Sequence, residues 1–213
     1  MKGLPLILCL TFGVPVVDAQ QPFETANRSM TNTDQSAGAQ LKLSTSVIEQ
    51  RYSVEAGSKL LRLTLNLTYS NTGNRAIMLD KKSSLVYRKL LSNSLKAASQ
   101  SKYEYDESSS FIDVRSMQAA GLRLEKTPEK EAFIILKPGE SYSLEKELIL
   151  RLYDGTKDSE HFLHPGTRFL QVRVATWYYF ADPLTYREKW RHEGYLWFQD
   201  VISEPMPLRV EKS

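Results

Sequence analysis

The sequence has a single cysteine, Cys9, which lies in an apolar segment near the amino terminus. A disulfide bond within the chain is therefore excluded, and no cysteine nucleophile is available beyond that segment. The Gly-x-Ser-x-Gly motif of many hydrolases is also absent. Beyond the amino-terminal segment there is no run of about 18 apolar residues, so no membrane-spanning helix is expected. These absences remove the commonest sequence signs of a covalent catalyst, a disulfide scaffold and a membrane protein.

An excess of charge of one sign is lacking as well. The chain has 28 lysines and arginines against 25 aspartates and glutamates, which gives a formal net charge of +3 at pH 7. Nucleic-acid-binding proteins usually gather lysine and arginine into a patch or stripe. No such stripe is visible in this sequence, which argues against a nucleic-acid partner.

The amino terminus has the three parts of a secretory signal peptide. Lys2 supplies the positive charge, residues 3–17 supply the apolar segment, and Ala19 follows as a small residue of the kind that a signal peptidase reads. We therefore predict a signal peptide at residues 1–19, with cleavage near Ala19. The mature protein is then expected to be extracytoplasmic, either periplasmic or secreted.

The composition changes after this segment. Residues 20–40 are rich in asparagine, threonine, serine, glutamine and glycine and have few apolar anchors. Such a composition cannot offset the entropy lost on ordering, so it predicts a flexible leader. Residues 41–213 have the alternating apolar content of a folded chain, and their length suits one domain.

The clearest structural signal is the segment at residues 59–71, in which apolar and polar residues alternate. One side of the expected strand carries Leu61, Leu63, Leu65, Leu67 and Tyr69. The other side carries Arg62, Thr64, Asn66, Thr68 and Ser70. A period of two predicts a half-buried antiparallel strand, whose apolar face must pack on a second layer.

Further strands are predicted from alternation and from the turns that bound them. Their expected positions are residues 41–52, 76–80, 132–136, 141–154, 167–180, 194–202 and 208–210, with residues 84–90 as a further candidate. The turn at residues 137–140 is expected to make a hairpin, and residues 194–202 are expected to pair back on residues 167–180. Pro205 and Pro207 limit the last strand to an edge.

Two segments are harder to assign. Residues 92–110 are poor in aliphatic side chains and predict a long excursion from the sheet, although Leu90, Leu91, Leu95 and Ala98 also suit a short helix. Residues 113–121 are a second helix candidate, with an aspartate to cap the start and a glycine to end it. The expected fold is an all-β, antiparallel, immunoglobulin-like β-sandwich of seven or eight strands, with long loops and one or two short helices.

Two segments resemble bacterial extracytoplasmic immunoglobulin-like domains. In LRLTLNLTYSNTGNRAI, at residues 61–77, a strand ends in an asparagine-rich turn, and in ILKPGESYSLEKELIL, at residues 135–150, a Pro-Gly turn precedes a strand. As a pattern the resemblance covers residues 41–210 and implies a sandwich of this type. Such domains serve as adhesins, chaperones, enzyme accessories and carbohydrate binders, so no functional residue can be carried over. The inter-sheet disulfide of antibody-type domains is absent.

An enzyme or a metal site would have to use the three histidines, His161, His164 and His192. Zinc sites need three or four ligands that converge on one point, and two histidines three apart in a polar connection are commonly surface residues. We therefore expect a non-catalytic protein without a cofactor, which binds a protein or a glycan or is a structural member of an envelope assembly. An extracytoplasmic hydrolase or metal-dependent enzyme that uses these histidines is the alternative.

Aromatic residues near the carboxyl end supply the candidate binding surface. If residues 167–180 and 194–202 were regular paired strands, several rings would share the polar face with Gln171 and Arg173. These residues are Trp177, Tyr179, Tyr195 and Trp197, and Trp190 lies in the loop that joins the two strands; together the five make the candidate binding surface. Flat rings on that face could stack on sugar rings or anchor a protein partner. In the alternative, the loop at residues 181–193 folds back over the rings, or a bulge near Ala175 swaps the faces.

Overall fold

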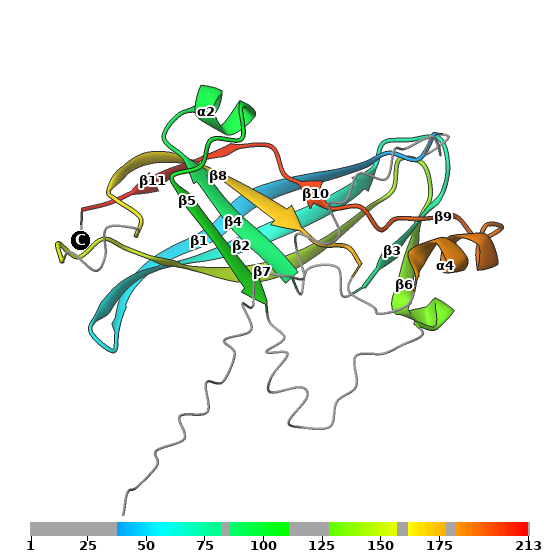
Figure 1. Ribbon diagram of the computed structural model, residues 1–213, viewed down its shortest axis with the longest axis horizontal. Coiled ribbons are helices and arrows are strands. Elements are labelled where there is room, and N and C mark those ends of the chain that lie inside the picture. Colours follow the sequence, from blue (N-terminus) through cyan, green and yellow to red (C-terminus); the bar gives the residue numbers. More distant parts are fainter. Residues whose placement is uncertain (1–37, 82–85, 111–127, 157–161, 178–181, 213) are drawn as a thin grey trace, which may run out of the picture. The chain divides into compact units, whose positions relative to one another are not determined.

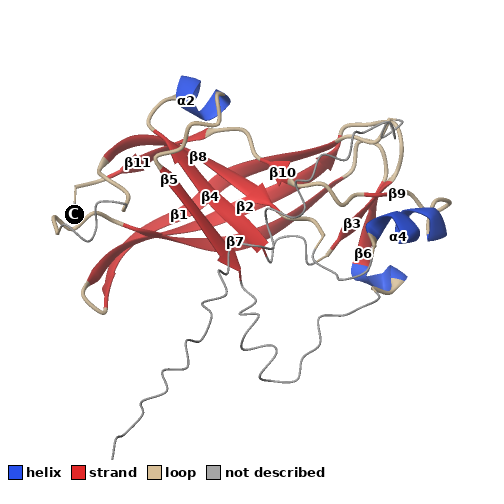
Figure 2. Ribbon diagram, in the orientation of Figure 1, coloured by secondary structure: helices blue, strands red, loops and turns tan. Residues whose placement is uncertain are grey.

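The computed structural model describes residues 38–81, 86–110, 128–156, 162–177 and 182–212. The predicted signal peptide at residues 1–19, nearly all of the leader and the helix candidate at residues 113–121 lie outside them. Within the described residues the chain is mostly β-strand with few helices, which confirms the all-β class (Figures 1 and 2). None of the described helices is long and apolar enough to cross a membrane.

The elements follow one another in a long series of strands. In chain order they are β1 (Leu41–Glu55), β2 (Ser58–Asn71), β3 (Ile77–Asp80), β4 (Val86–Ser92), α2 (Leu95–Ser99), β5 (Tyr105–Ser110), the 3₁₀-helix η2 (Lys130–Ala132), β6 (Phe133–Leu136), β7 (Ser141–Arg151), β8 (Gly166–Val174), α4 (Pro183–Lys189), β9 (Tyr195–Leu196), β10 (Val201–Ile202) and β11 (Met206–Val210).

These strands form three sheets. Sheet A has the order β1-β2-β7, sheet B has the order β6-β3-β9, and sheet C has the order β10-β8-β4-β5, with β11 also paired to β8. Every pair is antiparallel except β3 with β9. Sheets A and C contribute most of the main core, and sheet B adds Leu79 and Leu136 to it.

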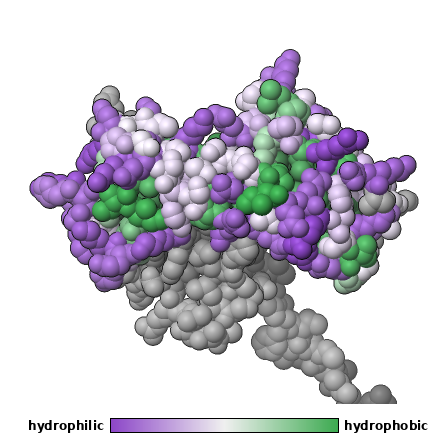
Figure 3. Space-filling view, turned by 180° about the vertical axis from the view of Figure 1, so that it is seen from behind, coloured by the Kyte–Doolittle hydropathy of each residue, from purple (hydrophilic) through white to green (hydrophobic). Residues whose placement is uncertain are grey.

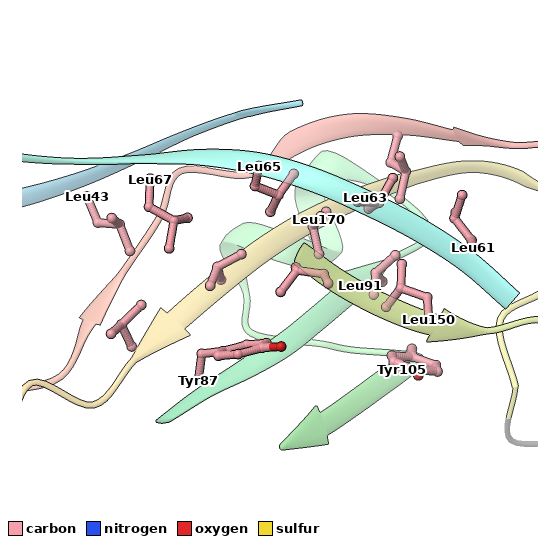
Figure 4. Close-up of a cluster of buried hydrophobic side chains, with 14 of the residues drawn as sticks. Leu43, Leu61, Leu63, Leu65, Leu67, Tyr87, Leu91, Tyr105, Leu150 and Leu170 are labelled. Carbon is pink, nitrogen blue, oxygen red and sulfur yellow. The ribbon is translucent and has the colours of Figure 1, made fainter. Parts of the chain in front are cut away.

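The main core confirms the alternation read from β2. Leu61, Leu63 and Leu65 are fully buried, while the residues between them are only half-buried. Figure 4 shows the β2 leucines opposite Leu170 of β8 and Leu91 of β4, which belong to sheet C. Burial of each such leucine side chain stabilises the fold by about 1.5–3 kcal/mol, because its apolar area is removed from water.

The turn between β1 and β2 lies at residues 55–58. Ala56 and Gly57 both have positive φ angles, of 47° and 81°. A two-residue hairpin turn of this kind matches the right-handed twist of its strands and favours residues that tolerate positive φ. A local sequence signal therefore places the turn of the long hairpin, and the leucine pattern determines which face of the hairpin is buried.

Side chains from sheet C cover part of the outer edge of β7. Lys89 of β4 donates from Nζ to the carbonyl oxygen of Ile149 at 2.7 Å, and the Tyr87 hydroxyl lies 3.4 Å from the carbonyl oxygen of Glu147. Lys89 is only 2% exposed, and its ammonium lies 2.6 Å from a carboxylate oxygen of Glu107. Burial lowers the pKa of Lys89, while the bond to Glu107 acts in the opposite direction. These bonds occupy backbone groups that a second chain could otherwise pair with.

On the opposite side of the sandwich, side chains also bind backbone groups of the facing layer. Gln50 of β1 donates from Nε2 to the carbonyl oxygen of Arg209 at 2.9 Å. The Tyr52 hydroxyl accepts a hydrogen bond from the backbone N–H of Glu211 at 2.9 Å. Side chains of one sheet therefore bind backbone groups of the other sheet along both open sides.

Three expectations about strand pairing are wrong. Residues 92–110 contain α2, which confirms the alternative of a short helix there, and also β5, which pairs with β4 instead of leaving the sheet. The turn at residues 137–140 joins β6 in sheet B to β7 in sheet A, so it makes no hairpin. Residues 194–202 are divided, since β9 pairs with β3 and only β10 pairs with β8. Eleven strands are therefore present in the described residues, more than the seven or eight expected.

Candidate functional site

Helix α4 positions the aromatic residues at one end of the molecule. Asp182 caps it, accepting hydrogen bonds from the backbone N–H groups of Leu184 and Thr185, and Pro183 occupies the first turn. Both features are typical helix-start signals. The bonds to Thr185 and Leu184 hold the pKa of Asp182 below its ordinary value of 3.8.

Four aromatic rings pack together between α4 and sheet B, and we call them the α4 cluster. Its members are Phe133, Trp177, Tyr186 and Trp190. Ring centroids are 5.0 Å apart between Phe133 and Trp190, 5.1 Å between Tyr186 and Trp190, and 6.2 Å between Trp177 and Tyr186. These separations fall in the range in which aromatic pairs attract one another. Met78 and Leu196 of sheet B complete the packing below the rings.

The rings of the α4 cluster differ in exposure. Trp190 is buried at 7% exposure, whereas Trp177 and Tyr186 are half-buried. Lys189 is exposed, and its ammonium lies 5.7 Å from the centroid of Tyr186 and 5.2 Å from that of Trp190. Two half-exposed rings beside a cation are therefore the part of this cluster that a partner can reach.

Tyr195 and Trp197 form a second group, on the other face of β9. Tyr195 is buried at 5% exposure, and its ring meets that of Trp197 edge to face at 6.1 Å. The guanidinium of Arg187 lies between the rings of Tyr195 and Phe198, 4.1 Å and 4.3 Å from their centroids, and donates to the Tyr195 hydroxyl. This arrangement ties α4 to β9 and leaves little of Tyr195 for a ligand.

The structure therefore divides the five predicted binding residues. Trp177 and Trp190 come together in the α4 cluster, Tyr195 and Trp197 lie on the opposite face of β9, and Tyr179 lies outside the described residues. One continuous platform of exposed rings does not form among the four that are described. β8 ends at Val174, so its alternation does not reach Trp177. Trp190 is buried against α4 and its neighbours, as expected in the alternative in which residues 181–193 fold back over the rings.

Sequence reasoning missed three contributors to this end of the molecule. Tyr186 and Lys189 belong to α4, and Phe133 belongs to β6. The dipeptide Asp182-Pro183 before a segment with aromatic residues four positions apart, Tyr186 and Trp190, is a readable helix-start signal. No local signal brings Phe133 to this helix, because that contact depends on sheet B.

The histidines do not assemble into a site in the described part of the chain. His164 is exposed and its ring lies 4.4 Å from that of Tyr153, just before β8, whereas His192 is exposed just after α4. Figure 1 shows the start of β8 and α4 at opposite ends of the sandwich. His161 lies outside the described residues. Among the residues that are described, no group of three or more metal-binding side chains was found.

Comparisons with known proteins assign no family. No protein-family model matches the chain, and no curated protein matches it significantly. Among solved structures, the X-ray structure of a Northeast Structural Genomics Consortium target is similar at 11% identity and a TM-score of 0.31, covering 82% of this chain and 87% of that one. A likeness at that level carries no argument about fold family or function.

Proposed function

We propose that this chain is an extracytoplasmic, non-catalytic binding module that holds a protein or a glycan at the α4 cluster. The observation that carries the proposal is the pair of half-exposed rings, Trp177 and Tyr186, fixed against buried neighbours and flanked by Lys189. Rings that are already held in place lose little conformational entropy when a partner binds. Tryptophan, tyrosine and cationic side chains are also frequent anchors in recognition surfaces.

The proposed architecture is an immunoglobulin-like β-sandwich, as in the extracytoplasmic domains that the sequence resembles. Two antiparallel sheets, A and C, that share one core support this assignment. The proposed location, periplasmic or secreted, is supported by the signal-peptide pattern at residues 1–19. Fractionation of the native host tests the location, because an uncleaved chain in the cytoplasm would contradict it.

Binding at the α4 cluster is tested by capture from an extracytoplasmic extract of the native host, together with a glycan array. We expect the full chain without its signal peptide to retain a partner or glycan that the double variant Trp177→Ala/Lys189→Ala does not. Arg191→Ala, an exposed change just after α4, is the matched control and should retain it. Lys189→Glu tests the same surface without removing a packed ring. Equal retention by all variants would place binding elsewhere.

A further inference from the structure

β1 lies at one end of sheet A, and β2 pairs with only one of its two edges. Apart from a single bridge between Leu43 and Ser203, no strand of the described residues pairs with the other edge. In an antiparallel ladder, every second residue of a strand points its N–H and C=O groups away from its partner. Residues 46–54, which we call the β1 edge, therefore present a row of backbone groups that no described strand binds.

The exposure of the β1 edge differs from that of a half-buried strand, in which every second residue is covered. Seven consecutive residues, at positions 46–52, are exposed. Val47 and Tyr52 are each 37% exposed, although their partners on β2, Leu65 and Leu61, are fully buried. The described residues of sheet C therefore cover neither the edge of this segment nor the whole of its inner face.

Exposed apolar side chains are concentrated on this segment. Of the nine large hydrophobic residues that are exposed in the described part of the chain, four lie here: Val47, Ile48, Tyr52 and Val54. Figure 3, which views the molecule from behind, shows hydrophobic residues gathered in separate patches among polar ones. Edge strands that stay unpaired usually carry lysine, proline or a bulge. The β1 edge has no lysine or proline, and its register shift adds an exposed isoleucine, Ile48, so its sequence does not oppose pairing.

The other end of sheet A is protected in a way that the β1 edge is not. Lys89 of sheet C donates to the backbone carbonyl of Ile149 on β7. On the β1 side the bonds run in the opposite direction, because Gln50 and Tyr52 use their side chains to bind the backbone of β11 and of the residue after it. Those two bonds leave the backbone groups of the β1 edge itself unoccupied.

We propose that the β1 edge pairs antiparallel with the β1 edge of a second copy of this chain, about a two-fold axis at Gln50. Unpaired N–H and C=O groups in a row are complementary to another strand, and a two-fold axis makes the contact a closed dimer. The two copies of sheet A then form one continuous sheet of six strands. The β1 edge shares no residue with the α4 cluster, so this inference does not rest on the proposed function.

The order of charges selects both the partner and the register. With the axis at Gln50, Glu49 of each copy lies opposite Arg51 of the other, and both side chains are more than half exposed. Ile48 lies opposite Tyr52 in the same register. Opposite charges and apolar pairs across strands stabilise a sheet, whereas an axis at Glu49 or Arg51 would place like charges opposite each other. The order Glu-Gln-Arg therefore complements itself, which favours a second copy over an unrelated strand.

Sedimentation equilibrium of the chain without residues 1–19 tests the dimer, and we expect a monomer–dimer equilibrium that shifts with concentration. Arg51→Glu places two carboxylates opposite each other on both sides of the axis and should raise Kd roughly tenfold or more. Glu49→Arg/Arg51→Glu restores opposite charges and should recover dimerisation. The matched control, Lys96→Glu, makes the same charge change at an exposed position of α2 and should leave Kd unchanged. Thermal melting verifies that the variants are folded. A monomer at every concentration, or a dimer that Arg51→Glu leaves intact, would overturn the proposal.

An introduced cysteine tests the register, because the chain has no cysteine beyond Cys9. Directly opposite residues of an antiparallel pair have Cα atoms about 4.5–5.5 Å apart, which suits a disulfide bond. Gln50→Cys should therefore cross-link two copies under oxidising conditions. In the control, Ser53→Cys, the two cysteines would lie about 20 Å apart along the strands and should not cross-link. Cross-linking at neither position, or equally at both, would overturn the proposed pairing.

Discussion

The side chain of Asn71 donates from Nδ2 to the carbonyl oxygen of Leu136 at 2.8 Å, although the two residues belong to different sheets. The same amide donates to the carbonyl oxygen of Arg75 at 2.8 Å, and its oxygen accepts from the N–H of Gly73 at 3.0 Å. The backbone of Asn71 also bonds to Glu140 and Gly139 in the turn before β7. One buried asparagine therefore joins the end of β2 to sheet B and to that turn.

Replacing Asn71 by alanine should lower the free energy of unfolding by about 2–3 kcal/mol. The change leaves the Leu136 carbonyl without this donor in a buried setting, and an unsatisfied buried acceptor costs about 1–3 kcal/mol. Thr72→Ala, at an exposed position in the same turn, is the control and should change stability little. Urea unfolding followed by tryptophan fluorescence measures both. Equal midpoints would contradict the role assigned to Asn71.

The pair of Lys89 and Glu107 is expected to show coupled, non-additive effects. Glu107→Ala leaves the Lys89 ammonium buried without its carboxylate, which should destabilise the fold by about 1–3 kcal/mol, since Glu107 is itself partly exposed. Adding Lys89→Met removes the uncompensated charge, so the double variant should recover part of the loss. A double variant less stable than Glu107→Ala, measured by the same unfolding experiment, would show that the bond from Lys89 to Ile149 outweighs the cost of the buried charge.

Much of sheet A could be predicted from the sequence, because its signals are local. The alternation from Leu61 to Tyr69 fixed the buried face of β2, and Ala56-Gly57 marked the turn that sets its register with β1. The pairing of β9 with β3 could not be predicted, since two residues carry no periodicity. Nor could β5 be predicted, since it lies at the end of sheet C and its residues 106–108 are polar and at least partly exposed.

The candidate site was predicted only in part, for a related reason. Alternate residues can be assigned to opposite faces only within a strand, and β8 ends before Trp177. The ring of Trp190 is buried because α4 lies over sheet B, a contact that no spacing in the sequence encodes.

The cap of α4 should make the environment of Trp190 depend on acid pH. The pKa of Asp182 is lowered in the folded state, so its carboxylate contributes stability that is present above the ordinary value of 3.8 and is lost as the pH falls through the folded pKa. Asp182→Asn keeps a cap without a titrating group and should remove this dependence, while Asp182→Ala should cost about 1 kcal/mol at neutral pH. Tryptophan emission recorded against pH for the three proteins tests this. Identical acid transitions in wild type and Asp182→Asn would contradict it.

The facing of β2 is tested by placing the same charge on its two sides. Leu65→Asp puts a carboxylate among fully buried leucines, so it should lower the free energy of unfolding by about 4 kcal/mol or more. Thr68→Asp puts it on the outer face, opposite Ser44 and Ser143, and should cost no more than about 1 kcal/mol. Thr68 is a better control than Thr64, whose partners Glu49 and Glu147 would repel a new carboxylate. Thermal and urea unfolding give both values, and equal losses would mean that the buried face of sheet A is wrongly assigned.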